Sequence, residues 1–328
     1  MADREQGPDP QRLARLLEDI VAETAESAER GETTDYLPEL ADVDVGQFGL
    51  VVVTCEDEIV AAGDADEPFT LQSISKVFSL ALALEAYGDA VWERVGREPS
   101  GDPYNSITDL ESHEGYPRNP FINPGALVVL DMLLAGRRGN EVPEFVRDYL
   151  VELIGEDLTI DENVVQSEES ANFTNRALAN LAKAFGNLHH AVDDVMAAYV
   201  RQCAIRVSCR QLALAGRFLI AEREDSDVPA ALEDERRARR IASLMLTCGQ
   251  YDGSGDFAYR VGLPAKSGVS GGILAIVPNL ASIAVWSPGL DENGNSLLGT
   301  LALERLSEAM DWSVFGATRV GSEVRSRT

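Results

Sequence analysis

The sequence places its extended segments in two groups, one near each end of the chain. The apolar runs "FGLVVVTC" (48–55) and "EIVAAGD" (58–64) flank a short acidic turn and predict a β-hairpin. A lone hairpin is only marginally stable in water, so this one requires further strands. The remaining candidates are "FAYRVG" (257–262), "GGILAIVP" (271–278) and "ASIAVWS" (281–287). We therefore expect one antiparallel sheet of about five strands, built from segments far apart in the chain.

The sequence between these groups has the periodicity of helices. Five segments there carry an apolar stripe that ends near a glycine or a charged cluster: "KVFSLALALEAYG" (76–88), "GALVVLDMLLAG" (125–136), "PEFVRDYLVELIG" (143–155), "NRALANLAKAFG" (175–186) and "RQLALAGRFLIAE" (210–222). A further helix is expected within residues 9–28. We predict an α/β protein in which helices flank the sheet and an all-helical lobe is inserted into it. It is expected to be a single domain over 1–328, with a sheet lobe (1–70 and 246–317), a helical lobe (71–245) and a loose tail (318–328).

The charge of the chain limits its partners. It carries 28 basic and 55 acidic residues, a formal net charge of −27, so its surface repels nucleic acid and anionic membranes. Lys76, Lys183 and Lys266 are the only lysines, and all other basic residues are arginines. An acidic excess with so little lysine predicts a salt-adapted protein, because molar salt shortens the Debye length to about 3 Å and screens the repulsion.

The start of the chain predicts neither export nor membrane insertion. It is charged from its first residues, it lacks the apolar core of a signal peptide, and no apolar run approaches the length of a membrane span. We expect a cytoplasmic protein. Its cysteines, Cys55, Cys203, Cys209 and Cys248, form no CxxC pair and are expected to be reduced thiols.

The stretch "FTLQSISKVF" (69–78) holds a candidate nucleophile and its base. Ser73 and Lys76 are three residues apart, so at the start of a helix they share one face. A serine nucleophile requires a base, which is usually histidine. The three histidines, His113, His189 and His190, lie in polar stretches without a GxSxG partner, and we expect them to be structural. A lysine can replace histidine if burial lowers its pKa from about 10.4 toward neutrality.

A second stretch contains another lysine at a position where an amine can take part in catalysis. In "PAKSGVSGGI" (264–273), Lys266, Ser267 and Gly268 stand at the entry of a strand and resemble the KTG element that accompanies SxxK in penicillin-recognising enzymes. The SDN or YxN element of those enzymes is missing from the sequence. Tyr251, in a glycine-rich turn expected just before a strand, is the candidate that assists Ser73 instead.

The order of these stretches resembles the serine-dependent glutaminases, a cytoplasmic family with a β-lactamase-like fold. The segments that carry the resemblance run from about Asp35 to Leu306: "DYLPELA", "FTLQSISKVFSLALALEAYG", "REPSGDPYNS", "NPFINPGA", "SEESANFTNRALA", "YVRQCAIRVSC", "MLTCGQYDGSGDFAYRVGLPAKSGVSGGI" and "SPGLDENGNSLLG". Two departures are visible. Pro124 stands where the family usually has alanine, and residues 172–174 differ from the usual residues before the matching Asn175.

The resemblance implies hydrolysis of L-glutamine to L-glutamate and ammonia through an acyl-enzyme. Ser73 is then the nucleophile, Lys76 the activating amine, and Tyr251 a partner in proton transfer. The implied substrate-binding residues are Tyr36, Gln72, Asn123, Glu168, Asn175, Tyr199 and Val269. Glu168 suits the α-ammonium of glutamine and the amides and tyrosines suit its α-carboxylate, while the backbone N–H groups of Ser73 and Val269 would form the oxyanion hole. The resemblance implies no metal or organic cofactor, and a homodimer or homotetramer.

Other interpretations remain open at this stage. Without the resemblance, Asn123 and Asn175 could be turn or cap residues, and Glu168, beside Glu169 in what reads as an acidic loop, would be a solvated charge. A β-lactamase or D-alanyl peptidase shares SxxK and the KSG element but requires export and an SDN-like motif. A catalytically silent amino-acid sensor on the same scaffold would bind glutamine without turning it over.

Overall fold

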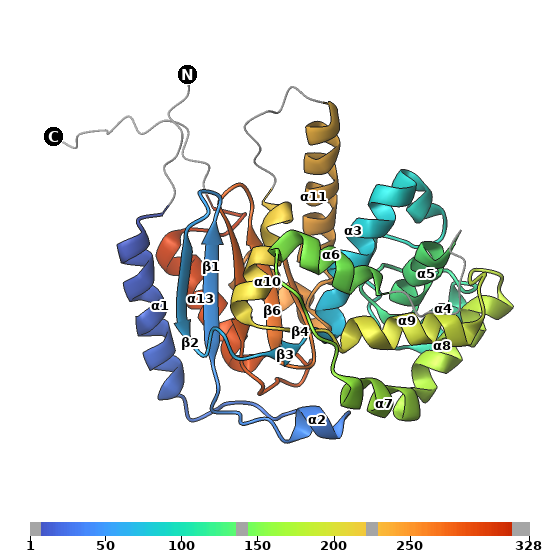
Figure 1. The fold of residues 1–328 in the computed structure, drawn as a ribbon, viewed down its shortest axis with the longest axis horizontal. Helices are drawn as coiled ribbons and strands as arrows, with labels where there is room; N and C mark the ends of the chain where they lie inside the picture. Colours follow the sequence, from blue (N-terminus) through green and yellow to red (C-terminus); the bar gives the residue numbers. More distant parts are fainter. Residues whose placement is uncertain (1–7, 136–143, 221–228, 317–328) are drawn as a thin grey trace.

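A computed structural model describes residues 8–135, 144–220 and 229–316 of the chain. Its sheet has five antiparallel strands in the order β2-β1-β7-β6-β5. The strands are β1 (Gly49–Thr54), β2 (Ile59–Gly63), β5 (Ala265–Ser267), β6 (Gly272–Val277) and β7 (Ala281–Trp286). The prediction of one antiparallel sheet built from both ends of the chain is confirmed, and Figure 1 shows β1 and β2 beside the late strands.

One predicted strand is wrong. Residues 257–262 lie largely in helix α12 (Ser254–Arg260), and β5 forms the edge of the sheet instead. Phe257 and Val261, four residues apart, are buried, whereas Tyr259 between them is 90% exposed. In a strand all three side chains would point to the same face, so this burial pattern has the period of a helix.

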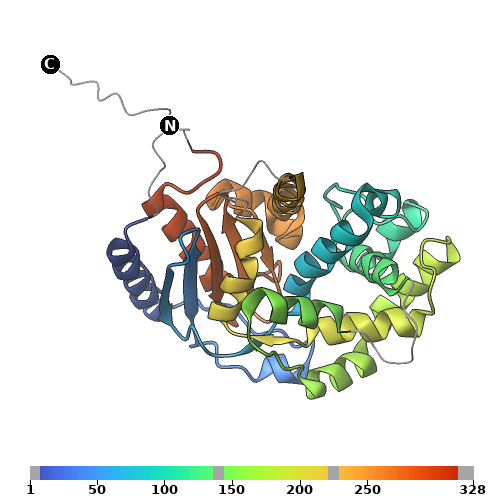
Figure 2. The ribbon, with the colours of Figure 1, turned by 45° about the horizontal axis from the view of Figure 1, so that its top comes forward.

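Helices cover both faces of the sheet. On β1, Leu50 and Val52 belong to a core shared with α1 (Pro10–Ala25) and α13 (Leu297–Met310). Val51 and Val53 belong to the larger core on the other face, where α10 (Cys209–Ala215) and the 3-10 turn η3 (Gly216–Leu219) pack (Figures 1 and 2). Because every residue of β1, β6 and β7 is buried, these strands read as continuous apolar runs.

The remaining helices form a cluster beside the sheet. They are α3 (Ser75–Tyr87), α4 (Ile107–Ser112), α5 (Asn123–Leu134), α6 (Phe145–Ile154), α7 (Glu162–Ala171), α8 (Phe173–Ala184), α9 (Val192–Cys203) and α11 (Pro229–Cys248). Shorter elements connect them: α2 (Pro38–Ala41), the turns η1 (Gln72–Ile74), η2 (Gly88–Glu93) and η4 (Tyr251–Gly253), and the strand pair β3 (Phe69–Thr70) and β4 (Arg206–Val207). The helix predicted over 210–222 gives way to η3 at Gly216, where a Cβ would lie 2.7 Å from the Leu274 side chain. The predicted tail 318–328 lies outside the described residues.

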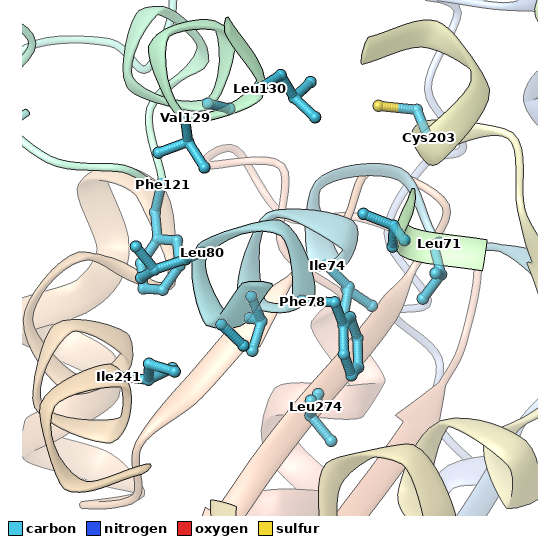
Figure 3. Packing of buried hydrophobic residues seen from close by; sticks show 14 of the residues in the cluster. Leu71, Ile74, Phe78, Leu80, Phe121, Val129, Leu130, Cys203, Ile241 and Leu274 are labelled. Carbon is cyan, nitrogen blue, oxygen red and sulfur yellow. The ribbon is translucent and has the colours of Figure 1, made fainter. Parts of the chain in front are cut away.

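Helix α3 runs through the largest core, and this determines the environment of the candidate site. Ile74, at the end of η1, and Phe78 point toward Leu274 of β6, while Leu80 lies toward Phe121 (Figure 3). All residues from Ser75 to Ala81 are buried. Since every residue at the start of α3 is buried, a polar side chain there is removed from water.

Candidate active site

Ser73 and Lys76 meet at the junction of η1 and α3. Lys76 Nζ lies 3.1 Å from Ser73 Oγ, and the side chains are 1% and 8% exposed, respectively. The amine also donates to Asn123 Oδ1 at 2.6 Å and to Phe121 O at 3.5 Å. The predicted contact of amine and hydroxyl is therefore present in a buried setting.

Burial changes the proton affinity of the amine. Removal from water lowers the pKa of Lys76 from 10.5 to about 8, while Cys203 and Glu168 act in the opposite direction. A substantial fraction of the amine is then neutral near pH 8. Only the neutral form can accept a proton from Ser73.

Tyr251 approaches the pair from the other side. Burial raises the pKa of its hydroxyl, and a side-chain hydrogen bond with Ser73 opposes that rise. The hydroxyl also lies 3.5 Å from Ser267 O, which accepts a 2.7 Å hydrogen bond from Lys266 Nζ. The Lys266 amine lies 4.3 Å from the centroid of the Tyr251 ring, and Lys266 is fully buried. The KSG element thus supports Tyr251, and β5 packs against the turn η1 that holds Ser73.

The backbone is strained on both sides of the site. Gln72, just before the nucleophile, has a φ of 47°, and Tyr251 has a φ of 50°. Both values are unusual for residues other than glycine and cost about 1 to 3 kcal/mol each. Tyr251 lies in η4 and precedes α12, so it stands before a helix rather than before the predicted strand.

The predicted substrate residues form a connected polar wall. Asn123 begins α5 and donates its amide to Asn175 Oδ1 of α8 at 2.8 Å. Tyr36 donates its hydroxyl to Glu168 Oε2 at 2.8 Å, although the two are 132 residues apart. Glu168 lies on helix α7 and is 2% exposed, so the reading as an acidic loop is wrong. Burial raises the pKa of Glu168, and the hydrogen bond from Tyr36 and the charge of Lys76 oppose that rise.

Three further predicted residues lie around this wall. Tyr199 on α9 is buried, and its ring centroid lies 5.9 Å from Lys76 Nζ. Gln72 is buried and donates to Thr70 Oγ1 at 3.5 Å. Val269 lies between β5 and β6 and packs against the apolar cluster of α2, α7 and α9. A Cβ on neighbouring Gly268 would lie 2.8 Å from Leu71 O, so glycine is what allows this turn to approach the nucleophile.

Comparison with known proteins decides the family. The glutaminase family model matches residues 31–315. A glutaminase of Azorhizobium caulinodans is 56% identical over 309 residues, covering 93% of this chain and 99% of its own length, and one of Mesorhizobium japonicum is 52% identical over 318 residues, covering 96% and 99%. The chain belongs to the glutaminase family. It is therefore an amidohydrolase, as the sequence predicts.

Solved structures of glutaminases share the fold of this chain. The probable glutaminase ybaS superposes with a TM-score of 0.82 at 36% identity, covering 93% of this chain and 99% of that one. The Bacillus subtilis glutaminase YbgJ superposes with a TM-score of 0.80 at 34% identity, covering 92% and 100%. The predicted β-lactamase-like fold is confirmed.

The structure places three further residues in the glutaminase site, none of which has a predicted role. Tyr104 packs its ring 4.8 Å from that of Tyr251. Cys203 interacts with Ser75 and Tyr199, and burial raises the pKa of its thiol to about 12. Asn172, noted only as a departure from the family pattern, contacts both Glu168 and Asn175. Tyr104 lies within a matched segment, but nothing in the sequence separates these residues from ordinary core or cap residues.

A cavity of this glutaminase lies beside Tyr251. It has a volume of about 530 Å³ and is lined by Tyr104, Phe121 and Tyr251 among others.

The histidines lie elsewhere: His113 bonds Asp109, and the turn of His189 and His190 bonds buried Asp131. None of the described helices is long and apolar enough to cross a membrane.

Proposed function

We propose that the chain hydrolyses L-glutamine to L-glutamate and ammonia through an acyl-enzyme on Ser73. The observation that supports this most strongly is the 3.1 Å contact between Lys76 Nζ and Ser73 Oγ in a buried site. In the first step Lys76 accepts the Ser73 proton while Oγ attacks the side-chain carboxamide carbon of glutamine. The C–N bond then breaks, and Tyr251 and Lys76 return the proton to the departing amine, which leaves as ammonia.

The second half of the reaction uses the same groups. A water molecule loses a proton to Lys76 and attacks the carbonyl carbon of the ester on Ser73. The bond between that carbon and Ser73 Oγ then breaks, and Lys76 returns the proton to Oγ as glutamate leaves. In both halves the negative oxygen of the tetrahedral intermediate would accept hydrogen bonds from the backbone N–H groups of Ser73 and Val269. Such donors contribute about 3 to 4 kcal/mol each to transition-state stabilisation. This part of the proposal needs neither metal nor organic cofactor.

The polar wall accounts for recognition of a free amino acid. Glu168 offers a buried carboxylate to the α-ammonium, and Tyr36 is hydrogen-bonded to it. Asn123 and Asn175 offer amide groups to the α-carboxylate, and Tyr199 and Gln72 complete the cradle. The related Bacillus subtilis structure is described as a covalent complex with 5-oxo-L-norleucine, formed by reaction with 6-diazo-5-oxo-L-norleucine. That adduct has the length of a glutamine side chain and supports covalent catalysis here.

The remaining expectations from sequence belong to the same proposal. They are a cytoplasmic location, adaptation to salt, the division into sheet and helical lobes, and assembly as a homodimer or homotetramer. A related structure of Bacillus glutaminase was determined in the presence of 4.3 M NaCl. Light scattering on the purified protein across a salt series tests assembly and salt adaptation together.

The proposed activity is tested with Ser73→Ala. We expect this variant to release no ammonia from glutamine while its thermal unfolding remains close to that of the wild type. Ser79→Ala is the matched control, because Ser79 is also buried, on α3, and bonds the Lys76 backbone oxygen rather than the Lys76 amine. Full activity of Ser73→Ala would refute the nucleophile assignment. Glutamine binding without turnover by the wild type would favour the sensor interpretation.

A further inference from the structure

Asn172 lies at the junction of α7 and α8, between two residues of the proposed substrate cradle. It is 3% exposed, its Nδ2 donates to Glu168 Oε2 at 2.9 Å, and its Oδ1 accepts a short hydrogen bond from Asn175 Nδ2. One buried amide therefore fixes a carboxylate and a second amide at the same time.

A local structural role does not explain this side chain. Asn172 is the N-cap of α8, a position where asparagine usually accepts a hydrogen bond from the backbone of the first turn. Its side chain makes no such bond, and its oxygen accepts from the Asn175 side chain instead. The amide is thus directed into the site, and the helix begins without a side-chain cap.

Asn172 completes a hydrogen-bond chain that runs in one direction. Lys76 donates to Asn123, Asn123 donates to Asn175, Asn175 donates to Asn172, and Asn172 donates to Glu168. Reversing any one amide would bring two donors or two acceptors into contact. The carboxylate at one end can only accept, so it fixes the orientation of all three amides, and the Lys76 amine at the other end donates in agreement with it.

The last hydrogen bond of this series, from Asn172 to Glu168, affects the charge of Glu168. A carboxylate must be ionised to bind an ammonium group, whereas burial favours its neutral form. The hydrogen bonds from Tyr36 and Asn172 both end on Oε2 and stabilise the anion. They also orient the carboxyl group, so that Oε1 can face the substrate.

We propose that Asn172 is a positioning residue that determines specificity for substrates with an α-ammonium group. It does so by keeping Glu168 ionised and oriented and by holding Asn175 in register with it. The inference rests on the proposed function, in which Glu168 binds the α-ammonium of glutamine. It adds to that function a residue to which the sequence analysis assigned no role.

The test compares two substrates in Asn172→Ala. The first is L-glutamine, and the second is 4-carbamoylbutanoate, which has the same carboxamide and carboxylate but no α-ammonium group. We expect kcat/KM for glutamine to fall about 10-fold to 100-fold, mainly through KM, because a buried charged acceptor loses a donor. For 4-carbamoylbutanoate we expect a smaller fall, because its carboxylate still uses Asn175 but its binding makes no use of Glu168. The ratio of the two kcat/KM values therefore falls in the variant.

Two further variants protect the test against a folding defect. Asn172→Leu replaces the amide by a side chain of similar volume and should lower the ratio in the same way. Asn180→Ala is the matched control, because Asn180 is an exposed residue of α8 that bonds only a backbone oxygen of its own helix. Thermal unfolding is measured for each variant, and a substrate ratio is not expected to respond to a general loss of stability.

Glu168→Gln separates failure of the inference from failure of the proposed function. If the wild type releases no ammonia from glutamine, the proposed function fails and the inference with it. If Glu168→Gln leaves the substrate ratio unchanged, the assignment of Glu168 and the inference fail, while hydrolysis through Ser73 stands. If Glu168→Gln lowers the ratio but Asn172→Ala and Asn172→Leu keep the wild-type value, the role of Asn172 is overturned and that of Glu168 stands.

Discussion

Replacing Lys76 by methionine should abolish activity and change how the stability of the fold depends on pH. The folded protein holds this amine with a pKa of about 8, whereas in the unfolded chain it titrates near its ordinary value of 10.5. Between these values the unfolded chain keeps a proton that the folded protein has lost. Raising the pH through this window therefore favours the folded state.

The magnitude follows from the two pKa values. A difference from 10.5 to about 8 corresponds to about 3 kcal/mol, at about 1.4 kcal/mol per pH unit. The buried charge destabilises the wild type by this amount below pH 8, and the destabilisation disappears above pH 10.5. Methionine has no titrating group. Relative to wild type, the stability of Lys76→Met should therefore decline by about 2 to 3 kcal/mol between pH 7 and pH 10.

The assay is urea unfolding of both proteins at matched pH values from 7 to 10. Loss of the hydrogen bonds to Ser73 and Asn123 lowers the free energy of unfolding of the variant by a similar amount at every pH. It therefore leaves the pH dependence of the difference between the two proteins unchanged. Groups remote from Lys76 titrate alike in both proteins and cancel in the difference. A difference that stays constant across this range would refute the lowered pKa of Lys76, and with it the argument that burial makes this amine a base.

Other changes have equally specific expected outcomes. Asp131→Asn should lower the free energy of unfolding by about 3 kcal/mol at pH 7 in urea titrations, because the fully buried carboxylate pairs with Arg94. Hydrogen bonds from Arg94 and from the turn of His189 and His190 lower the pKa of Asp131, so the stability that this carboxylate contributes in the wild type is lost only as the pH falls below about 4. Equal stability of the two proteins at pH 7 would contradict this. Lys266→Met should reduce kcat about 10-fold or more with little change in KM, since the amine holds Tyr251 in place; unaltered kcat would argue against a positioning role. Gly268→Ala would place a Cβ 2.8 Å from a backbone oxygen of the segment before the nucleophile, and steady-state ammonia assays should detect at least a 10-fold loss of kcat/KM. Raising NaCl from about 0.1 to 1 M should increase the melting temperature, since the Debye length falls from about 10 to 3 Å around a net charge of −27; a falling melting temperature would contradict adaptation to salt.

The sequence predicted the parts of the fold that repeat a simple period. The sheet and the helix α3 follow from long apolar runs, and Ser73 and Lys76 meet because a spacing of three residues fixes their geometry. The run at residues 257–262 predicts a strand because its larger apolar residues alternate, although Phe257 and Val261 also have the spacing of one helix face. Only the exposure of Tyr259 separates a strand from a helix here.

Contacts over long sequence distances could not be derived from spacing. Glu168 meets Tyr36 across 132 residues, and without the family resemblance its neighbours in sequence indicate a solvated charge. Asn172 has the residue type and the position of a helix cap. Its contacts in the site depend on how α7 and α8 pack against α5. Such roles arise from tertiary packing, which a local pattern does not encode.

Covalent labelling of Ser73 tests the central claim most directly. The wild type and Lys76→Met are treated at pH 8 with 6-diazo-5-oxo-L-norleucine, and the modified peptide is located by mass spectrometry. The account predicts one adduct on Ser73 in the wild type and a rate lower by at least about 100-fold in Lys76→Met. An adduct on another residue, or equal rates in the two proteins, would contradict it.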